Sequence, residues 1–371
     1  MNWKVRYVDY PAQFKSMDQE IMGTIRTILS NGDLMLRQQL RDFEANLASF
    51  VGAQYAVGTS NCTDAMHLSL RAAGIGSGDE VITVSHTFVA TVAGIHHAGA
   101  TPVLVDIGED HNINTKLVEQ AITPSTRAII PVHLNGRLCD MGKLMEITEE
   151  AGLLIIEDAA QALGASFQGK KGGSWGLAGC FSFYPAKLLG AFGDAGAVVT
   201  NKESMANAIR ELRDHGRTLD GDISGWSFNC RLDNLQAALL DLKLKRVPEW
   251  IARRRELASV YHHELSNIEQ LELPPRPVER GDYFDVFQNY EVEAVDRDQL
   301  VEHLKRNGVE IFLPWGGKGV HQFKALGLAH FHLPRTEMFF EKALMLPLHP
   351  ELTTEQVRYV SEVIREFYAS H

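Results

Sequence analysis

The sequence predicts an α/β protein with a large domain over residues 1–245, built on a mainly parallel central sheet, and a smaller C-terminal α+β domain over residues 246–371. Short apolar, β-branched runs alternate with helix-length amphipathic stretches in the first two-thirds of the chain, which is typical of a parallel sheet covered by helices on both faces. The alternation stops near Asn229, where a long helical stretch begins. A chain of 371 residues is also long enough for about two domains.

The strand-like runs of the first part are nearly continuous in apolar residues, as expected of strands buried on both faces. They are YAVGT (55–59), EVITVS (80–85), TPVLVDI (101–107), RAIIPVH (127–133), LLIIED (153–158), CFSFY (180–184) and GAVVT (196–200). The helix-like stretches between them include CTDAMHLSLRAAG (62–74), TFVATVAGIHHAG (87–99), DMGKLMEITEEAG (140–152) and KESMANAIRELRDHG (202–216). Sheets of this class place their chemistry at the carboxyl ends of the strands.

The second part begins with a helical stretch over residues 231–265, which we expect to be broken at Pro248. Residues 288–295 (QNYEVEAV) predict a strand, and residues 296–308 and 353–368 predict helices. This mixture indicates the smaller α+β domain.

Composition excludes several classes of protein. The formal net charge of −11, from 36 Lys+Arg against 47 Asp+Glu, argues against nucleic acid as a partner. The four cysteines form no C-x-x-C pair, so neither a metal site nor a disulfide framework is predicted. The N-terminus lacks the apolar stretch of a signal peptide, and no 18-residue apolar span occurs, so we predict a cytoplasmic protein with no membrane partner.

Residues 72–80 (AAGIGSGDE) contain a G-x-G-x-G pattern that is also found in dinucleotide-binding loops. Here the glycines follow a predicted helix and precede a predicted strand, which is the reverse of the order such loops require. A helix C-terminal cap is therefore favoured over a nicotinamide site.

Lys187 is one of only two charged residues in the apolar stretch over residues 180–200, the other being Asp194. Lysine is almost never fully buried without a partner, and desolvation of its ammonium lowers its pKa. A lysine in such a place either reaches water or uses its amine chemically, because an amine with a lowered pKa is a competent nucleophile.

Two other chemical features follow strands. Glu157 and Asp158 come directly after the apolar run LLII, and the small polar turn GTSNCTDAMHLSL (58–70) lies between a strand and a helix. This turn offers several good N-cap residues, so it predicts a helix N-terminus that attracts an anion. Its candidate caps are Ser60, Asn61, Thr63 and Asp64.

A lysine in an apolar place, a carboxylate at a strand end and a phosphate-ready helix start are the three features that pyridoxal 5′-phosphate (PLP) requires. The lysine serves as nucleophile and proton shuttle. The carboxylate keeps the pyridine nitrogen protonated, so that the ring can accept electrons.

The chain also resembles the DegT/DnrJ/EryC1/StrS family of sugar aminotransferases over nearly its whole length. The most specific match is LLIIEDAAQALGASFQGKKGGSWGLAGCFSFYPAKLLGAFGDAGAVVTN (153–201), and residues 60–107 and 228–240 match independently in the right order. The resemblance implies the PLP-dependent transferase fold of type I, which is like that of aspartate aminotransferase.

The resemblance also implies roles for individual residues. Lys187 matches the Schiff-base lysine, Asp158 the partner of the pyridinium, and Gln161 the residue beside the phenolic oxygen of the cofactor. The phosphate-binding positions are Ser182, Cys62 and Thr63, although a glycine is common where Cys62 stands. Phe88 matches the ring that stacks on the cofactor, and Asn229 matches an asparagine that reaches the cofactor phosphate of a neighbouring subunit, which implies at least a homodimer.

Structural interpretations of some of these residues stay open at this point. Asp158 also suits the N-cap of a following helix, Gln161 an ordinary polar contact, and Phe88 core packing at the start of a helix.

The implied reaction moves an amino group from L-glutamate to a keto-sugar attached to a nucleoside diphosphate, through alternating PLP and pyridoxamine phosphate forms. Such a reaction serves amino-sugar biosynthesis for a surface polysaccharide, such as lipopolysaccharide, or for a glycoside. One alternative is a PLP-dependent sugar dehydratase, in which a histidine replaces the lysine, so Lys187 argues against it. The other is a regulator that keeps the fold without catalysis, which the intact set of site residues disfavours.

The sequence departs from the family pattern in residues 311–328, at Arg37 and at Asn135, which stands where an aromatic residue is common. These regions border the sugar-nucleotide pocket in the family. Because this chain departs from the family pattern there, the resemblance does not identify the sugar. Further candidates for that pocket are Tyr184, His215, Arg217, Trp315, Lys318 and His321, with Arg217 and Lys318 suited to a diphosphate. Each also suits a solvated surface position, and we keep them outside the predicted site.

Overall fold

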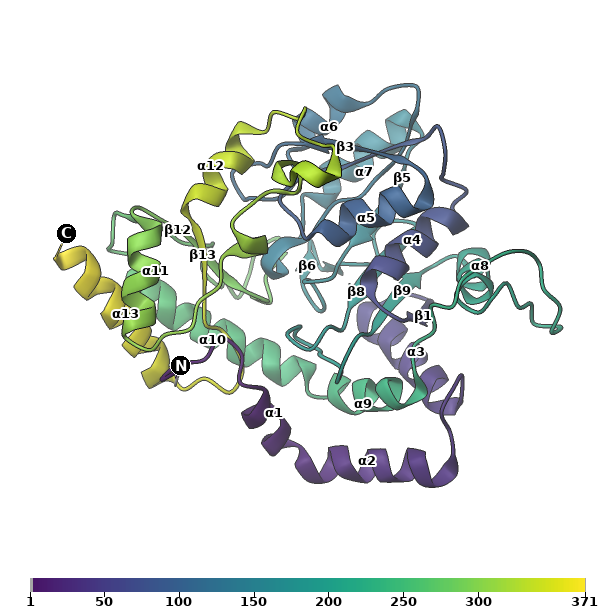
Figure 1. The fold of residues 1–371 in the computed structure, drawn as a ribbon, viewed down its shortest axis with the longest axis horizontal. Coiled ribbons are helices and arrows are strands. Elements are labelled where there is room, and N and C mark those ends of the chain that lie inside the picture. Colours follow the sequence, from purple (N-terminus) through teal and green to yellow (C-terminus); the bar gives the residue numbers. More distant parts are fainter. Residues whose placement is uncertain (1–2, 371) are drawn as a thin grey trace.

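The computed structural model describes residues 3–370. Its centre is a seven-stranded sheet with the strand order β1-β9-β8-β5-β4-β2-β3 (Figure 1). The strands are β1 (Tyr55–Thr59), β2 (Glu80–Val84), β3 (Thr101–Val105), β4 (Thr126–Ile129), β5 (Leu154–Asp158), β8 (Ala178–Ser182) and β9 (Gly196–Thr200). All neighbouring pairs from β8 to β3 are parallel, whereas β9 pairs antiparallel with both β1 and β8. The predicted α/β fold with a mainly parallel sheet is confirmed.

Helices cover both faces of this sheet, and the alternation of side chains along β9 shows how. Val198 packs in a core cluster with α4 (Cys62–Ala72), α5 (Val89–Ala98) and α8 (Glu203–Arg213). Its neighbours Ala197 and Val199 pack on the other face, in the cluster that contains side chains of α3 (Gln38–Val51), α7 (Met141–Ala151) and α9 (Asn234–Leu244). The apolar strands are therefore buried on both sides, as parallel strands in a covered sheet must be.

The helices at the N-terminus were not among the predicted elements. They are α1 (Tyr10–Ser16), α2 (Asp18–Asn31) and α3, and α2 packs against α9 along one side of the molecule (Figure 1). Ahead of them, Val5 pairs with Val309 and is buried in the core of the second, smaller sheet.

That smaller sheet has the strand order β10-β12-β13 and lies with α10, α11 and α13 at the end of the molecule that holds the C-terminus (Figure 1). Its elements are α10 (Val247–Leu265), β10 (Leu271–Glu272), β12 (Tyr290–Ala294), α11 (Arg297–Arg306), β13 (Ala343–Leu346) and α13 (Thr354–Ala369). The predicted break near Pro248 is confirmed, because α9 ends at Leu244 and Pro248 lies in the first turn of α10. The division of the chain at residue 245 remains a prediction.

Several of the remaining elements connect the two parts. A third sheet, in the order β11-β6-β7, joins segments on both sides of residue 245. The elements are α6 (Thr115–Ala121), β6 (Ser166–Phe167), β7 (Lys170–Lys171), β11 (Tyr283–Phe284) and α12 (Pro334–Lys342). Phe339 and Phe340 of α12 pack into the core of the large sheet.

Some predicted elements are shorter in the structure. The strand predicted over residues 127–133 is β4, which ends at Ile129 shortly before Pro131, a residue that has no N–H for a sheet. The strand predicted over residues 180–184 is β8, which ends at Ser182. The glycines of residues 74–78 lie between α4 and β2, as the cap interpretation requires. Within residues 3–370, none of the helices combines the length and the hydropathy that a membrane crossing needs.

Candidate active site

A cavity of about 420 Å³ lies where the chain leaves β1, β2, β5 and β8. Of the predicted site residues, it is lined by Cys62, Thr63, Phe88, Asp158, Gln161, Ser182 and Lys187. Asn229 does not line the cavity, and its side chain is exposed. Cys62 and Lys187 lie in this one cavity although they are 125 positions apart in the sequence. The sheet brings them together because the carboxyl ends of its parallel strands share one edge.

Lys187 lies five residues beyond the end of β8 and is partly buried at the cavity wall. Burial lowers the pKa of its amine below the ordinary value, and the negative charge of Asp158 opposes that shift. The backbone around it is fixed by Gln288, whose side chain accepts from the Leu188 amide at 2.7 Å and donates to the Ala186 carbonyl at 3.0 Å. The turn that carries Lys187 is therefore held in place by Gln288. The lowered pKa makes the Lys187 amine a better nucleophile than that of a solvated lysine.

Asp158 is 4% exposed and ends β5. Its Oδ2 accepts from Thr91 Oγ1 at 2.6 Å, and its Oδ1 accepts from the Ala160 amide at 3.1 Å. In the part of the chain that the structure describes, the element that follows β5 is the strand β6 and not a helix, so the N-cap interpretation of Asp158 is wrong. Thr91 was not among the predicted site residues. It lies four residues after Thr87 in TFVAT, and the hydroxyl oxygens of these two threonines are 2.7 Å apart in the structure.

The start of α4 faces the same cavity. Asn61 caps the helix by accepting from the Asp64 amide at 2.8 Å, and the amides of Cys62 and Thr63 have no acceptor within the helix by its geometry. A Cβ on Gly196 would lie 2.4 Å from the carbonyl carbon of Asn61, so only glycine lets β9 approach this turn. The free amides, the helix dipole and the nearby Ser182 hydroxyl together present an arrangement that suits an anion.

Aromatic side chains form another wall of the cavity. Phe88 is 55% exposed, so it is not packed in the core, and its ring centroid lies 5.7 Å from that of Trp315. Trp315 and Tyr184, both candidates for the sugar-nucleotide pocket, line the cavity as well. The indole Nε1 of Trp315 is buried and has no hydrogen-bond partner in the described part of the chain.

The other candidates for the sugar-nucleotide pocket lie outside this cavity. His215, Arg217 and Lys318 are exposed. His321 is 3% exposed, with its Nδ1 2.6 Å from Ser85 Oγ and its Nε2 3.2 Å from Glu337. The surface interpretation of His321 is therefore wrong: it fixes the loop that carries Trp315 to the end of β2.

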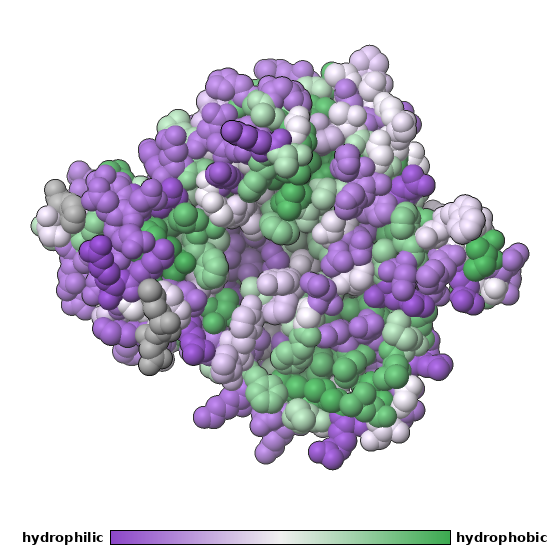
Figure 2. Space-filling model, in the orientation of Figure 1, coloured by the Kyte–Doolittle hydropathy of each residue, from purple (hydrophilic) through white to green (hydrophobic). Residues whose placement is uncertain are grey.

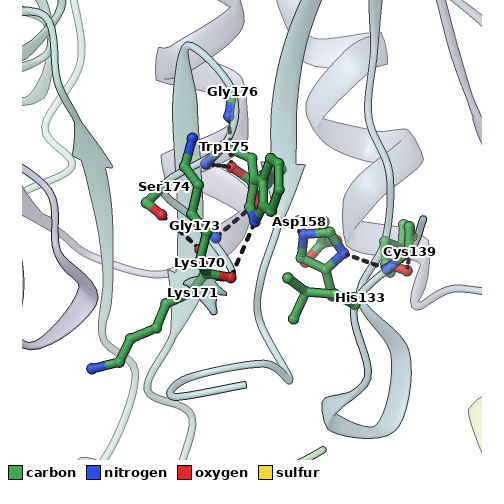
Figure 3. A network of polar contacts seen from close by, with 12 residues as sticks. His133, Cys139, Asp158, Lys170, Lys171, Gly173, Ser174, Trp175 and Gly176 are labelled. Carbon is green, nitrogen blue, oxygen red and sulfur yellow. Dashed lines mark hydrogen bonds and ion pairs between the residues drawn. The ribbon is translucent and has the colours of Figure 1, made fainter. Parts of the chain in front are cut away.

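Glu157 precedes Asp158 but points away from the cavity, because successive side chains of a strand alternate between its faces. It is fully buried and accepts from the amides of Gly173, Trp175 and Gly176 at 2.7, 2.7 and 2.8 Å (Figure 3). His133 completes this network, with its Nε2 3.0 Å from Glu157. The Nδ1 of His133 accepts from the Cys139 amide, so the ring proton lies on Nε2 and is donated to Glu157. Glu157 therefore supports the backbone beside the cavity.

Glu291 is a further buried carboxyl group, on β12 behind the cavity. Burial raises the pKa of Glu291 from 4.5 to about 7. The charge of Glu293 also raises this pKa, whereas His111 and the hydrogen bond from the Asn135 side chain lower it. His86 Nε2, 3.8 Å away, also faces it, but burial lowers the pKa of His86 to about 3 and keeps that ring neutral.

Glu291→Gln should therefore stabilise the protein in a pH-dependent way. Because the pKa of Glu291 is higher in the folded protein than in the unfolded chain, the folded state binds the proton more tightly. The contribution of Glu291 to the free energy of unfolding is therefore fully present below pH 4.5 and is lost as the pH rises through about 7. At pH 8 we expect the variant to be more stable than the wild type by up to about 3 kcal/mol, with little difference at pH 4.5. Thermal unfolding at both pH values measures this, and an equal difference at both would contradict it.

Comparison with known proteins places these features in context. Residues 15–365 match the model of the DegT/DnrJ/EryC1/StrS aminotransferase family. The chain is 39% identical over 368 residues to a "pleiotropic regulatory protein" of Geobacillus stearothermophilus, covering 98% of both chains. It is also 39% identical over 368 residues to the dTDP-3-amino-3,4,6-trideoxy-α-D-glucose transaminase of Streptomyces venezuelae, covering 98% of this chain and 96% of that one.

Among solved structures, the crystal structure of S. venezuelae DesV in complex with a ketimine intermediate superposes with a TM-score of 0.93. That protein is 38% identical to this chain, and the match covers 98% of each.

Proposed function

The chain belongs to the DegT/DnrJ/EryC1/StrS aminotransferase family, whose similar members include a sugar-nucleotide transaminase, and from this premise we propose the reaction that its cavity serves. The protein transfers the amino group of L-glutamate to a keto-sugar carried on a nucleoside diphosphate, with PLP as the cofactor. One observation supports this proposal most strongly. A single cavity contains the Lys187 amine with its lowered pKa, the buried carboxylate of Asp158 and the start of α4, which suits an anion.

The residues of the cavity fit PLP. Asp158 is held by Thr91 and suits the pyridine nitrogen, while the amides of Cys62 and Thr63 and the Ser182 hydroxyl suit the phosphate. The exposed ring of Phe88 suits a face of the cofactor. When bound, PLP supplies an aldehyde that reacts with amines and a ring that accepts electrons.

Lys187 has two tasks in this reaction. Its Nζ would hold the cofactor by reacting with the aldehyde, and the lowered pKa of the amine favours the unprotonated form that this requires. With an amino donor bound, the same Nζ would accept the proton from Cα of the donor and hold it for return to the product. Asp158 would hold the ring nitrogen of the cofactor through its carboxylate, and the walls formed by Phe88 and Trp315 limit access of water.

An absorbance experiment tests this proposal. The protein incubated with PLP should show a band in the visible region that disappears when L-glutamate is added and returns with a keto-sugar nucleotide. A panel of such nucleotides, with the position of the new amine determined by NMR, would then identify the sugar. Failure to take up PLP would contradict the proposed function.

A non-catalytic regulator is the second candidate, because one relative at 39% identity is named a pleiotropic regulatory protein. A regulator does not require both an activated amine and a buried carboxylate in one cavity, and this chain has both. A PLP-bound protein whose spectrum does not respond to L-glutamate would favour the regulator. The dehydratase alternative is disfavoured by Lys187 itself.

We also propose that the working unit is a homodimer in which Asn229 reaches the cavity of the partner. Asn229 is exposed and follows a projecting loop whose Leu219, Ile223 and Trp226 are 91%, 53% and 105% exposed. Figure 2 shows hydrophobic atoms at the tip of this loop, away from the body of the molecule. Exposed apolar side chains of this kind indicate a surface that another chain covers.

Mixed dimers test this arrangement. Lys187→Ala and Asn229→Ala proteins should each be impaired when pure, because every cavity lacks one residue. Co-expression in equal amounts should restore about a quarter of the wild-type activity, since half of the dimers are mixed and each mixed dimer has one intact cavity. Activity no higher than the mean of the two pure variants would contradict shared sites.

A further inference from the structure

The amide of Gln161 has a fixed orientation at the cavity wall. Its Oε1 accepts from the backbone amide of Asn135 at 2.7 Å and lies 3.5 Å from the donor Nδ2 of Asn289. Because these donors engage the oxygen, the Nε2 end is the one left for the cavity. Among residues 3–370, no protein atom accepts a hydrogen bond from it. Gln161 therefore presents a donor, and not an acceptor, to a molecule in the cavity.

Asn135 is held in a conformation that few residues adopt. Its φ of 56° and ψ of 12° lie in the left-handed region, which asparagine tolerates better than most residues. Its carbonyl accepts from the Gln288 amide at 2.9 Å, and the carbonyl of the next residue, Gly136, accepts from Val286 at 3.0 Å. The turn that carries the Asn135 amide is thus attached to residues 286–288.

The side chain of Asn135 is held at both ends. Its Nδ2 donates to Glu291 Oε1 at 2.6 Å, and its Oδ1 accepts from Asn289 Nδ2 at 2.8 Å. Asn289 is itself held by the Tyr7 hydroxyl, which donates to its Oδ1 at 3.1 Å. The acceptor Glu291 is 7% exposed and has no other hydrogen-bond partner among the described residues. Phenylalanine at position 135 could make neither of these side-chain bonds.

We infer that Asn135, fixed by Glu291 and Asn289, is a positioning residue that determines which end of the Gln161 amide faces the cofactor. This inference rests on the proposed function, because it assigns the Gln161 donor to the phenolic oxygen of PLP. A donor at that oxygen stabilises its negative charge, so the proton that the oxygen shares with the Lys187 nitrogen is released at a lower pH. If the Gln161 amide is disordered or reversed, this donor is lost and the proton is released at a higher pH.

The pH titration of the visible absorbance of bound PLP tests the inference. Gln161→Ala removes the donor and should raise the midpoint by about one pH unit, as expected for a hydrogen bond to a charged group. Asn135→Gly keeps the left-handed turn accessible but removes both side-chain bonds, and should raise the midpoint by at least about half a unit. Glu291→Leu removes the acceptor at similar volume and should act in the same direction.

Two variants serve as controls. Glu291→Gln keeps an oxygen that accepts from Asn135, so its midpoint should stay within about 0.2 units of the wild type. Glu293→Gln lies two residues further on the same strand, where Glu293 pairs with His111 at 2.9 Å and makes no contact with Asn135, and it should also leave the midpoint unchanged. These two results separate the loss of the bond from a general change of charge.

The outcomes distinguish this inference from the proposed function. Raised midpoints in Asn135→Gly and Glu291→Leu, with unchanged midpoints in both controls, support it. Unchanged midpoints in Asn135→Gly and Glu291→Leu overturn it, as does an unchanged midpoint in Gln161→Ala, while the response of the wild type to L-glutamate still supports an aminotransferase. A wild-type protein that takes up no PLP would overturn both proposals.

Discussion

Lys187→Ala should reduce turnover by at least about four orders of magnitude, because in the proposed reaction one amine acts both as nucleophile and as proton carrier. The variant loses the attacking Nζ, and no other lysine lines the cavity in the part of the chain that the structure describes. The measurement is kcat with L-glutamate and a keto-sugar nucleotide, together with the visible spectrum after incubation with PLP. The band that depends on the amine should be absent.

Two matched variants show whether the effect belongs to this amine. Lys187→Arg keeps a positive charge, but a guanidinium stays protonated and cannot carry the proton, so it should be as inactive as Lys187→Ala. Lys171 is another lysine whose pKa burial lowers, and it lies outside the cavity. Lys171→Ala should keep kcat within about threefold. More than 1% of wild-type kcat in Lys187→Ala would contradict the assigned role.

Glu157→Ala should cause a large loss of stability. Its carboxylate accepts from three backbone amides and His133 with no exposure to water. Its removal leaves four donors without an acceptor, of which the Gly173 amide and His133 are buried and the other two are partly buried. An unsatisfied buried donor costs about 1–3 kcal/mol, and we expect the free energy of unfolding to fall by roughly 4 kcal/mol or more. Because natural proteins are stable by only about 5–15 kcal/mol, this variant should unfold well below the wild-type Tm.

Thermal unfolding followed by circular dichroism measures this effect. Glu157→Gln keeps one acceptor oxygen and should fall between the wild type and Glu157→Ala. Glu119 is an exposed glutamate that pairs with Lys143 at 3.1 Å, and Glu119→Ala should change the free energy of unfolding by less than about 0.5 kcal/mol. A Glu157→Ala protein with a wild-type Tm would show that water or rearranged backbone satisfies the amides.

The sequence was sufficient to predict the central sheet and the cavity residues that follow its strands. Lys187, Asp158 and the start of α4 each lie within five residues of the carboxyl end of an apolar strand, and parallel strands bring such positions to one edge. The reversed direction of β9 was not foreseen, because GAVVT is as apolar as the parallel strands and its sequence carries no sign of direction.

The supporting residues escaped prediction because their partners are distant in the sequence. Gln288 lies 101 positions after Lys187, and its contacts with the neighbours of Lys187 depend on how the smaller sheet packs on the larger one. Glu291 in QNYEVEAV fits an ordinary strand, yet it is buried. Glu157 and Asp158 are adjacent, and alternation along a strand predicts that they face opposite sides without indicating which one faces the cavity.

The pairing of Val5 with Val309 joins two segments that are 304 positions apart in the sequence. The Lys4 amide donates to the Gly308 carbonyl at 2.8 Å, and the Glu310 amide donates to the Val5 carbonyl at 2.9 Å. The strands of the large sheet lie between these segments in the sequence, so that sheet can leave the ribosome while the N-terminal segment still lacks its partner. Contacts between residues so far apart in the sequence form slowly, because the chain loses conformational entropy on closing the loop before the contact stabilises it. Attachment of Val5 is therefore expected to be a late step in folding.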